Sequence, residues 1–125
     1  MRYYGVSMAI ASAAADNLGI PLATYLGGIS GSNIPCPMMN ILNGGQHADN
    51  NINIQEFMVV PIDIKEFPEK IRACSEIYYS LKNILKEEEL LSGIGDEGGF
   101  APNLKNDEEA LEFINRAINK AGYQG

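Results

Sequence analysis

The sequence predicts an α/β fold whose elements follow the order helix, strand, strand, helix, helix. An alanine-rich stretch over residues 4–18 is typical of a helix, and two short apolar runs over residues 34–42 and 52–61 are typical of strands. Two amphipathic stretches, over residues 65–89 and 106–122, complete the order as helices. Because two strands do not form a sheet that is covered on both faces, we expect this unit to require further strands.

The first helix is expected to end at Gly19, because glycine adopts the left-handed cap conformation and the nearby Pro21 cannot continue a helix. The glycine- and serine-rich stretch over residues 27–32 is typical of a linker between two structural units. The loop between the two predicted strands is shorter than a parallel crossover requires, so the strands are expected to pair antiparallel.

Each of the last two helices has an apolar stripe that is expected to face the core. In the first of them the stripe consists of Phe67, Ile71, Cys74, Tyr78, Leu81 and Leu85. In the second it consists of Ala110, Ile114, Ala117, Ile118 and Ala121. Asn106 is expected to cap the last helix, because Glu109 follows three residues later at the spacing of a capping box.

The charge of the chain argues against a nucleic-acid partner, and the lack of a long apolar stretch argues against a membrane. Sixteen acidic residues stand against nine basic ones, a formal net charge of −7, and the lysines are scattered rather than gathered on one face. No signal peptide is recognised, and no apolar stretch has the length that a membrane span requires. Cys36 and Cys74 do not form a CxxC pair and are expected to be reduced core residues, which suits a cytoplasmic protein.

Residues 95–103 (GDEGGFAPN) crowd two carboxylates between glycines. Glycines let a backbone approach a ligand closely, and a carboxyl presented to a closed site has a raised pKa that suits it to donate a proton. Glu97 is therefore a candidate general acid. The same spacing also fits a plain turn in which Asp96 bonds the backbone and Glu97 faces water, so both interpretations stay open from the residues alone.

A second unusual segment, residues 40–57 (NILNGGQHADNNINIQEF), contains the single histidine of the chain. His47 lies in its polar loop, where it is either a group that contacts a ligand or a surface residue. Gln55 and Glu56 are adjacent in an apolar strand and so point to opposite faces. In a strand buried on both sides each of them needs a polar partner or a functional site, which makes them candidate binding residues.

Together these two segments resemble the enolase family, most closely in its bacterial form, and the likeness extends over nearly the whole chain. The resemblance implies that Glu97 is the acid that protonates the departing C3 hydroxyl of 2-phosphoglycerate. It implies that Glu56 lies beside the same hydroxyl and that Gln55 lies in the substrate site. It further implies that His47 belongs to a mobile loop that closes over the phosphate end of the substrate.

The fold that the resemblance implies is the opening ββαα portion of an enolase-type (β/α)8 barrel, which residues 34–125 would begin. Residues 1–33 would contain the last helix of an N-terminal capping domain and a linker. The family's Mg²⁺ ligands and lysine base would lie outside this chain, so we expect the chain alone to be inactive. The implied partners are 2-phosphoglycerate and phosphoenolpyruvate, with a parent enzyme that forms a homodimer or a higher homo-oligomer.

Two alternatives remain. The chain could be a noncatalytic enolase-derived remnant or a module that docks on a partner. It could also be a small metal-binding module built on Asp49, Asp96 and Glu97, which a magnesium titration without substrate would reveal.

Overall fold

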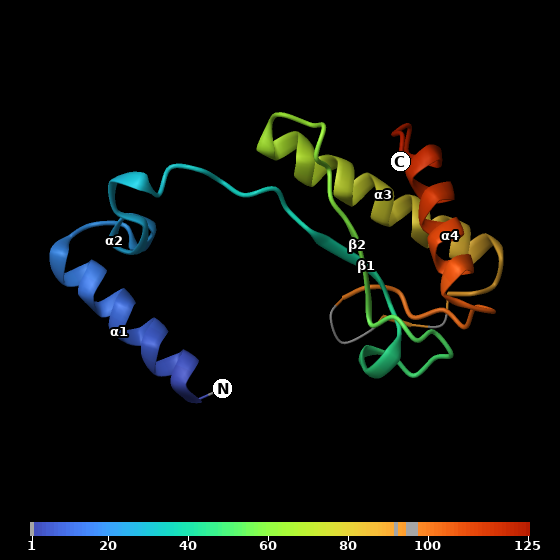
Figure 1. Cartoon of the computed structure of the whole chain (residues 1–125), viewed down its shortest axis with the longest axis horizontal. Coiled ribbons are helices and arrows are strands. Elements are labelled where there is room, and N and C mark those ends of the chain that lie inside the picture. The colour runs from blue at the N-terminus through green and yellow to red at the C-terminus, as the bar shows by residue number, and fades with distance from the viewer. Residues whose placement is uncertain (1, 92, 95–97) are drawn as a thin grey trace. The chain divides into compact units, whose positions relative to one another are not determined.

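The computed structural model describes residues 2–91, 93–94 and 98–125, and it divides into two compact units, Met1–Pro35 and Cys36–Gly125. In chain order the elements are α1 (Arg2–Leu18), α2 (Leu22–Gly27), the 3₁₀ turn η1 (Gly28–Ser30), β1 (Met39–Asn43), the 3₁₀ turn η2 (Gly45–His47), β2 (Glu56–Val59), α3 (Phe67–Glu87) and α4 (Asp107–Lys120) (Figure 1). The predicted order of helix, strand, strand, helix, helix is confirmed, with the short α2 as an addition.

The first unit consists of α1, α2 and η1. As predicted, α1 ends at a left-handed glycine: Gly19 has a φ of 67°, and its backbone N–H donates to the carbonyl of Asp16 at 3.1 Å. Ala15 is buried, whereas many of the large apolar side chains of this unit are exposed. These include Tyr3, Tyr4, Val6, Met8, Ile10, Leu18, Leu26 and Ile29.

Within the described residues, no single helix is long and apolar enough to cross a membrane. Residues Tyr3–Leu18 and Leu22–Ser30, which are bent by 102° relative to each other, meet the criterion only as a pair and only by length and composition.

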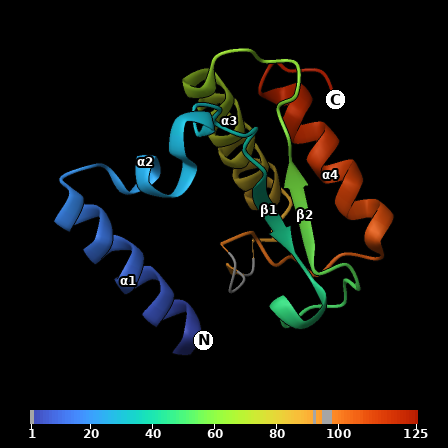
Figure 2. The same ribbon diagram turned by 60° about the vertical axis from the view of Figure 1, so that its left-hand side comes forward.

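The second unit is built on the antiparallel pair β1 and β2 (Figure 2), which confirms the predicted pairing. The register places Asn40 opposite Met58 and Asn43 opposite Glu56. The register shifts between Asn40 and Leu42, so the ladder is irregular at that point of β1. Because residues opposite each other share a face, Asn43 and Glu56 lie side by side at the end of the sheet where β1 ends.

Helices α3 and α4 pack against each other and share one hydrophobic core with the sheet (Figure 2). The sheet supplies Ile41, Leu42, Phe57 and Val59 to this core, and the two helices supply Cys74, Ile77, Leu81, Ile84, Leu85, Ala110, Phe113, Ile114 and Ala117. At the surface the two helices are joined by ion pairs, Lys120 with Glu87 at 3.0 Å and Arg116 with Glu88.

The predicted cap of α4 is confirmed: the side-chain oxygen of Asn106 accepts from the backbone N–H of Glu109 at 2.9 Å. The carboxylate of Glu109 in turn accepts from the N–H of Lys105 at 2.6 Å. Gly122, with a φ of 88°, follows the end of α4 as predicted. At the corresponding position after α3, Glu89 has a φ of 59°, so a non-glycine residue occupies a left-handed cap there.

Some predicted boundaries differ from the structure. β1 begins at Met39 rather than at residue 34, because Pro35 and Pro37 have no N–H to donate to a strand ladder. β2 is limited to Glu56–Val59, and residues 52–55 belong to the loop before it. In α3 the side chain of Ile71 is 37% exposed. Ala73 and Ile77 face the core of the unit on that stretch.

Candidate functional site

The candidate site lies where β1 ends and β2 begins. Asn43 is fully buried at the end of β1, and its cross-strand partner Glu56 is half-buried at the start of β2. Gln55 directly precedes β2 and is exposed. The structure thus places two of the residues selected from the sequence, Gln55 and Glu56, at the same end of the sheet.

The loop that follows β1 folds back on the start of β2. The N–H of Gly44 donates to the carbonyl of Gln55 at 3.1 Å, and the N–H of Gly45 donates to that of Ile52 at 2.6 Å. Gly45 has a φ of 57°, and a Cβ on it would lie 2.8 Å from the side chain of Gln55. The backbone of His47 forms the end of η2 in this loop, and its side chain lies outside what the structure describes.

Two asparagines tie this loop to the chain that precedes α4. The side-chain N–H₂ of Asn50 donates to the carbonyl of Asn43 at 2.9 Å and to that of Pro102 at 3.1 Å. The side-chain oxygen of Asn51 accepts from the N–H of Leu104 at 3.0 Å. Long-range hydrogen bonds to the backbone therefore set the shape of the loop.

The glycine-rich segment that follows Glu97 is bonded to β1. The N–H of Phe100 donates to the carbonyl of Ile41 at 3.0 Å, and the carbonyl of Phe100 accepts from the N–H of Asn43 at 2.8 Å. These two bonds place Phe100 beside β1 as an isolated parallel bridge. The N–H of Gly99 donates to the side-chain oxygen of Asn43 at 2.8 Å.

Two contacts join the described residues on either side of residues 95–97. Ile94 forms an isolated antiparallel bridge with Phe100, and the N–H of the residue after Phe100 donates to the carbonyl of Gly93 at 3.3 Å. Asp96 and Glu97 lie outside the described residues. The predicted acid role of Glu97 therefore stays a prediction.

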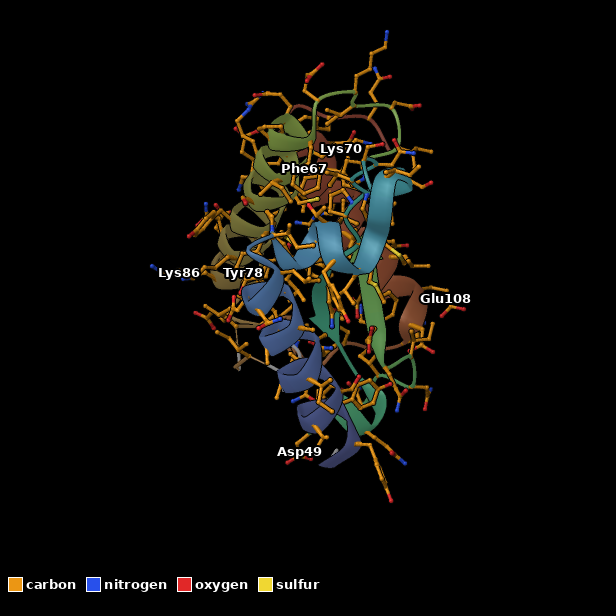
Figure 3. The ribbon with its side chains drawn as sticks, turned by 90° about the vertical axis from the view of Figure 1, so that its left-hand side faces the viewer. Asp49, Phe67, Lys70, Tyr78, Lys86 and Glu108 are labelled. Carbon is orange, nitrogen blue, oxygen red and sulfur yellow. The ribbon has the colours of Figure 1, made fainter. Side chains whose placement is uncertain are left out.

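Tyr78, which is labelled on α3 in Figure 3, contacts the segment of Gly98 and Phe100. Its ring stacks on that of Phe100 with 4.4 Å between the ring centroids and an interplanar angle of 25°. Its hydroxyl donates to the carbonyl of Gly98 at 3.3 Å. Burial, with a smaller contribution from Tyr79, raises the pKa of Tyr78, so its hydroxyl stays protonated and able to donate.

The buried amide of Asn43 joins the two segments. Its nitrogen donates to the carbonyl of Gln55 at 3.2 Å, and its oxygen is the acceptor for Gly99. Gly99 has no room for a side chain, because a Cβ would lie 2.8 Å from the backbone nitrogen of Leu42 and closer still to the Asn43 oxygen. Asn43 is not among the residues selected from the sequence, although an amide at the end of an apolar strand needs partners when it is buried.

A cavity of about 510 Å³ lies elsewhere in the second unit, against the chain that leaves β2. Its largely apolar walls include Val60, Ile64, Ile77 and Ile118, and neither Gln55 nor Glu56 lines it. In the part of the chain that the structure describes, no three His, Cys, Asp or Glu side chains are grouped so that they could hold a metal ion.

The fold and these contacts define an α/β protein whose polar groups gather at one end of its sheet, the place where active sites form in α/β barrel domains. Residues 32–125 match the family model described as the enolase C-terminal TIM barrel domain. The chain belongs to this family, which confirms the resemblance at the level of the domain. The matched range contains all four residues selected from the sequence: His47, Gln55, Glu56 and Glu97.

Proposed function

We propose that this chain is part of a bacterial-type enolase, a carbon–oxygen lyase that reversibly dehydrates 2-phospho-D-glycerate to phosphoenolpyruvate in glycolysis and gluconeogenesis. The family match over residues 32–125 supports this proposal. The observation that carries it is the attachment of the glycine-rich segment, through Gly99 and Phe100, to the end of β1 beside Glu56. Gly99 and Phe100, which follow closely on Glu97 in the sequence, are therefore attached at the end of the sheet where Glu56 lies.

The chemistry of dehydration explains why an acid is needed there. Removal of the C2 proton of the substrate creates an enediolate, and the C3–O bond then breaks to form the double bond. Hydroxide is a poor leaving group, so a proton donor must deliver a proton to the C3 oxygen as water departs. We assign this step to Glu97. A closed site of low dielectric constant keeps a carboxyl protonated at neutral pH, so that it can donate this proton.

The other candidate residues bind the substrate in this proposal. Glu56 lies beside the C3 hydroxyl, from a position on β2 that faces Asn43. Gln55, which is exposed and directly precedes β2, contacts the substrate. His47, in the loop after β1, closes over the phosphate end.

Enolases use Mg²⁺ to hold the negative charge of the enediolate. As the resemblance implies, the proposal assigns the family's Mg²⁺ ligands and lysine base to positions outside this chain. The proposed enzyme is cytoplasmic and homo-oligomeric, and its partners are 2-phosphoglycerate and phosphoenolpyruvate rather than nucleic acid or membrane.

The domain boundaries of the sequence analysis are retained as part of the proposal. Residues 1–33 would be the end of a capping domain with its linker, and residues 34–125 the first part of the barrel. The structure separates two units at Pro35, and the family match begins at residue 32. Both observations support a boundary in this stretch.

Two assays test the function. The purified chain, given 2-phosphoglycerate and Mg²⁺, is expected to form no phosphoenolpyruvate. A hybrid, in which residues 32–125 replace the matching segment of an enolase of known activity, is expected to form it. A folded hybrid without activity would contradict the proposal and favour the noncatalytic remnant or docking module. Product formed by the chain alone, and lost on Glu97→Gln, would show that these residues contain a base and a metal site.

A further inference from the structure

The side chain of Asn43 occupies a position that the proposed roles of the carboxyl groups do not explain. It is fully buried, although it is polar and lies at the end of a strand in contact with the hydrophobic core. A buried amide is tolerated where its donor and its acceptor are both satisfied. Both groups of Asn43 are satisfied by backbone groups of distant segments.

These two partners have a special place in the sequence. Gly99, which donates to the Asn43 oxygen, follows Glu97 by two residues. Gln55, whose carbonyl accepts from the Asn43 nitrogen, directly precedes Glu56. The amide therefore joins two backbone groups that are close in sequence to the two candidate carboxyl groups.

The contact also depends on close approach of the backbones. Gly99 is buried, and a side chain at this position would collide with the Asn43 oxygen and with the backbone of β1. Phe100 is bonded on both its N–H and its carbonyl to β1. The Asn43 amide thus adds a side-chain hydrogen bond to the backbone bonds that attach Gly99 and Phe100 to β1.

We propose that Asn43 is a positioning residue of this site, whose amide joins Gly99, two residues after Glu97, to the backbone of Gln55, directly before Glu56. The roles of the two carboxyls rest on the function proposed above. The two hydrogen bonds of the Asn43 amide, to Gly99 and to Gln55, form what is called the bridge below, and they are independent of that function. A general acid works only within hydrogen-bond reach of the leaving group, so a displaced loop lowers the rate of C–O cleavage. A displacement of about 1 Å in a catalytic group is associated with a loss of reaction rate of roughly 100-fold.

Asparagine is the side chain whose neutral amide matches both partners. A leucine has a similar size and provides neither donor nor acceptor. An aspartate keeps an acceptor for the Gly99 N–H and has no N–H₂ to give to the Gln55 carbonyl. The substitutions Asn43→Leu and Asn43→Asp therefore separate the two halves of the bridge.

The bridge is tested by ¹⁵N NMR on the 125-residue chain. In Asn43→Leu the Gly99 amide is expected to shift and to lose most of its protection from hydrogen exchange. In Asn43→Asp it keeps that protection, and its shift follows the ionisation of the introduced carboxyl. The control Asn40→Leu, on the same strand, leaves the Gly99 amide unchanged. An unchanged Gly99 amide in Asn43→Leu overturns the proposal. If that variant does not fold, loss of protection in a folded Asn43→Asp overturns it instead.

The consequence for catalysis is measured in the hybrid. Asn43→Leu is expected to lower kcat for dehydration about 10- to 100-fold with little change in KM. Exchange of the C2 proton with D₂O is expected to persist, because it precedes the acid step. Asn43→Asp is expected to restore part of kcat. Equal losses of exchange and dehydration would indicate a merely structural role and overturn the proposal. An inactive wild-type hybrid would contradict the proposed function, and the Gly99 amide would still decide whether the bridge exists.

Discussion

Two asparagines on β1 offer a direct test of how buried amides affect the stability of this fold. The amide of Asn43 is buried and bonded to Gln55 and Gly99. The amide nitrogen and oxygen of Asn40 are also buried, and among the described residues they have no hydrogen-bond partner. Replacement of each by leucine, which has a similar size, should therefore change stability in opposite directions.

The magnitudes follow from the groups that each change leaves behind. Asn43→Leu leaves the buried N–H of Gly99 without an acceptor, whereas the Gln55 carbonyl keeps its bond from the N–H of Gly44. The unpaired N–H of Gly99 costs about 1–3 kcal/mol, and the lost hydrogen bond to the Gln55 carbonyl costs about 1 kcal/mol more. The free energy of unfolding is therefore expected to fall by about 2–4 kcal/mol. Asn40→Leu removes two buried polar atoms that lack partners, so a gain of about 1 kcal/mol is expected.

Urea unfolding of the chain, followed by circular dichroism at several wavelengths, provides the measurement. The midpoint is expected to fall for Asn43→Leu and to rise for Asn40→Leu, with the slope m unchanged in both variants. Equal shifts of the two midpoints, or a loss of stability for Asn40→Leu as large as that for Asn43→Leu, would refute the reasoning from hydrogen-bond partners.

Further predictions concern other groups of the second unit. Gly99→Ala should destabilise the chain by about 1–3 kcal/mol in urea unfolding, since a Cβ collides with β1; an unchanged midpoint would contradict this. Cys36, which is half-buried, should be alkylated by iodoacetamide well before Cys74, which is fully buried and whose pKa is raised by burial. Mass spectrometry that finds both modified at one rate would contradict this order. The hydroxyl of Tyr123 donates to Glu76 at 2.5 Å and is the main cause of the lowered pKa of that carboxyl. The contribution of this contact to stability is present above the pKa of the unfolded state and lost as pH falls through the folded-state pKa. In an NMR titration Tyr123→Phe should raise the pKa of Glu76; no change would show that the hydroxyl does not matter.

The helices were predictable because their stripes and end signals are local. Gly19 and Gly122 have the left-handed conformation that the sequence led us to expect, and Asn106 caps α4 through its side chain. The short α2 was not predicted, because it follows directly on Pro21 and lies next to glycines. The end of α3 has no glycine, and Glu89 takes up a left-handed conformation that no local pattern indicates.

The extent of the strands and the centre of the site depend on contacts that a single sequence does not show. Proline limits the start of β1, and its end at Asn43 is defined by bonds to Phe100, far along the chain. Glu56 was selected because a charged residue in an apolar strand needs an explanation. The same reasoning applies to Asn43, but its partners at Gln55 and Gly99 become known only when the chain is folded.

The central claim is that Glu97 supplies the proton for C–O cleavage in an enolase site. Dehydration of 2-phosphoglycerate by the hybrid separates this step from proton removal at C2. Glutamine at position 97 has nearly the same size and no acidic proton. The exposed Glu108 on α4 provides a matched control (Figure 3).

The decisive measurement compares phosphoenolpyruvate formation with C2 exchange in D₂O for Glu97→Gln and Glu108→Gln. The account predicts that Glu97→Gln lowers phosphoenolpyruvate formation by about 100-fold or more while C2 exchange persists, since general acids contribute roughly 10²- to 10⁴-fold. Glu108→Gln should leave both rates unchanged. Equal losses of both rates in a folded Glu97→Gln hybrid, or no loss in either, would contradict the assignment of Glu97 as the acid.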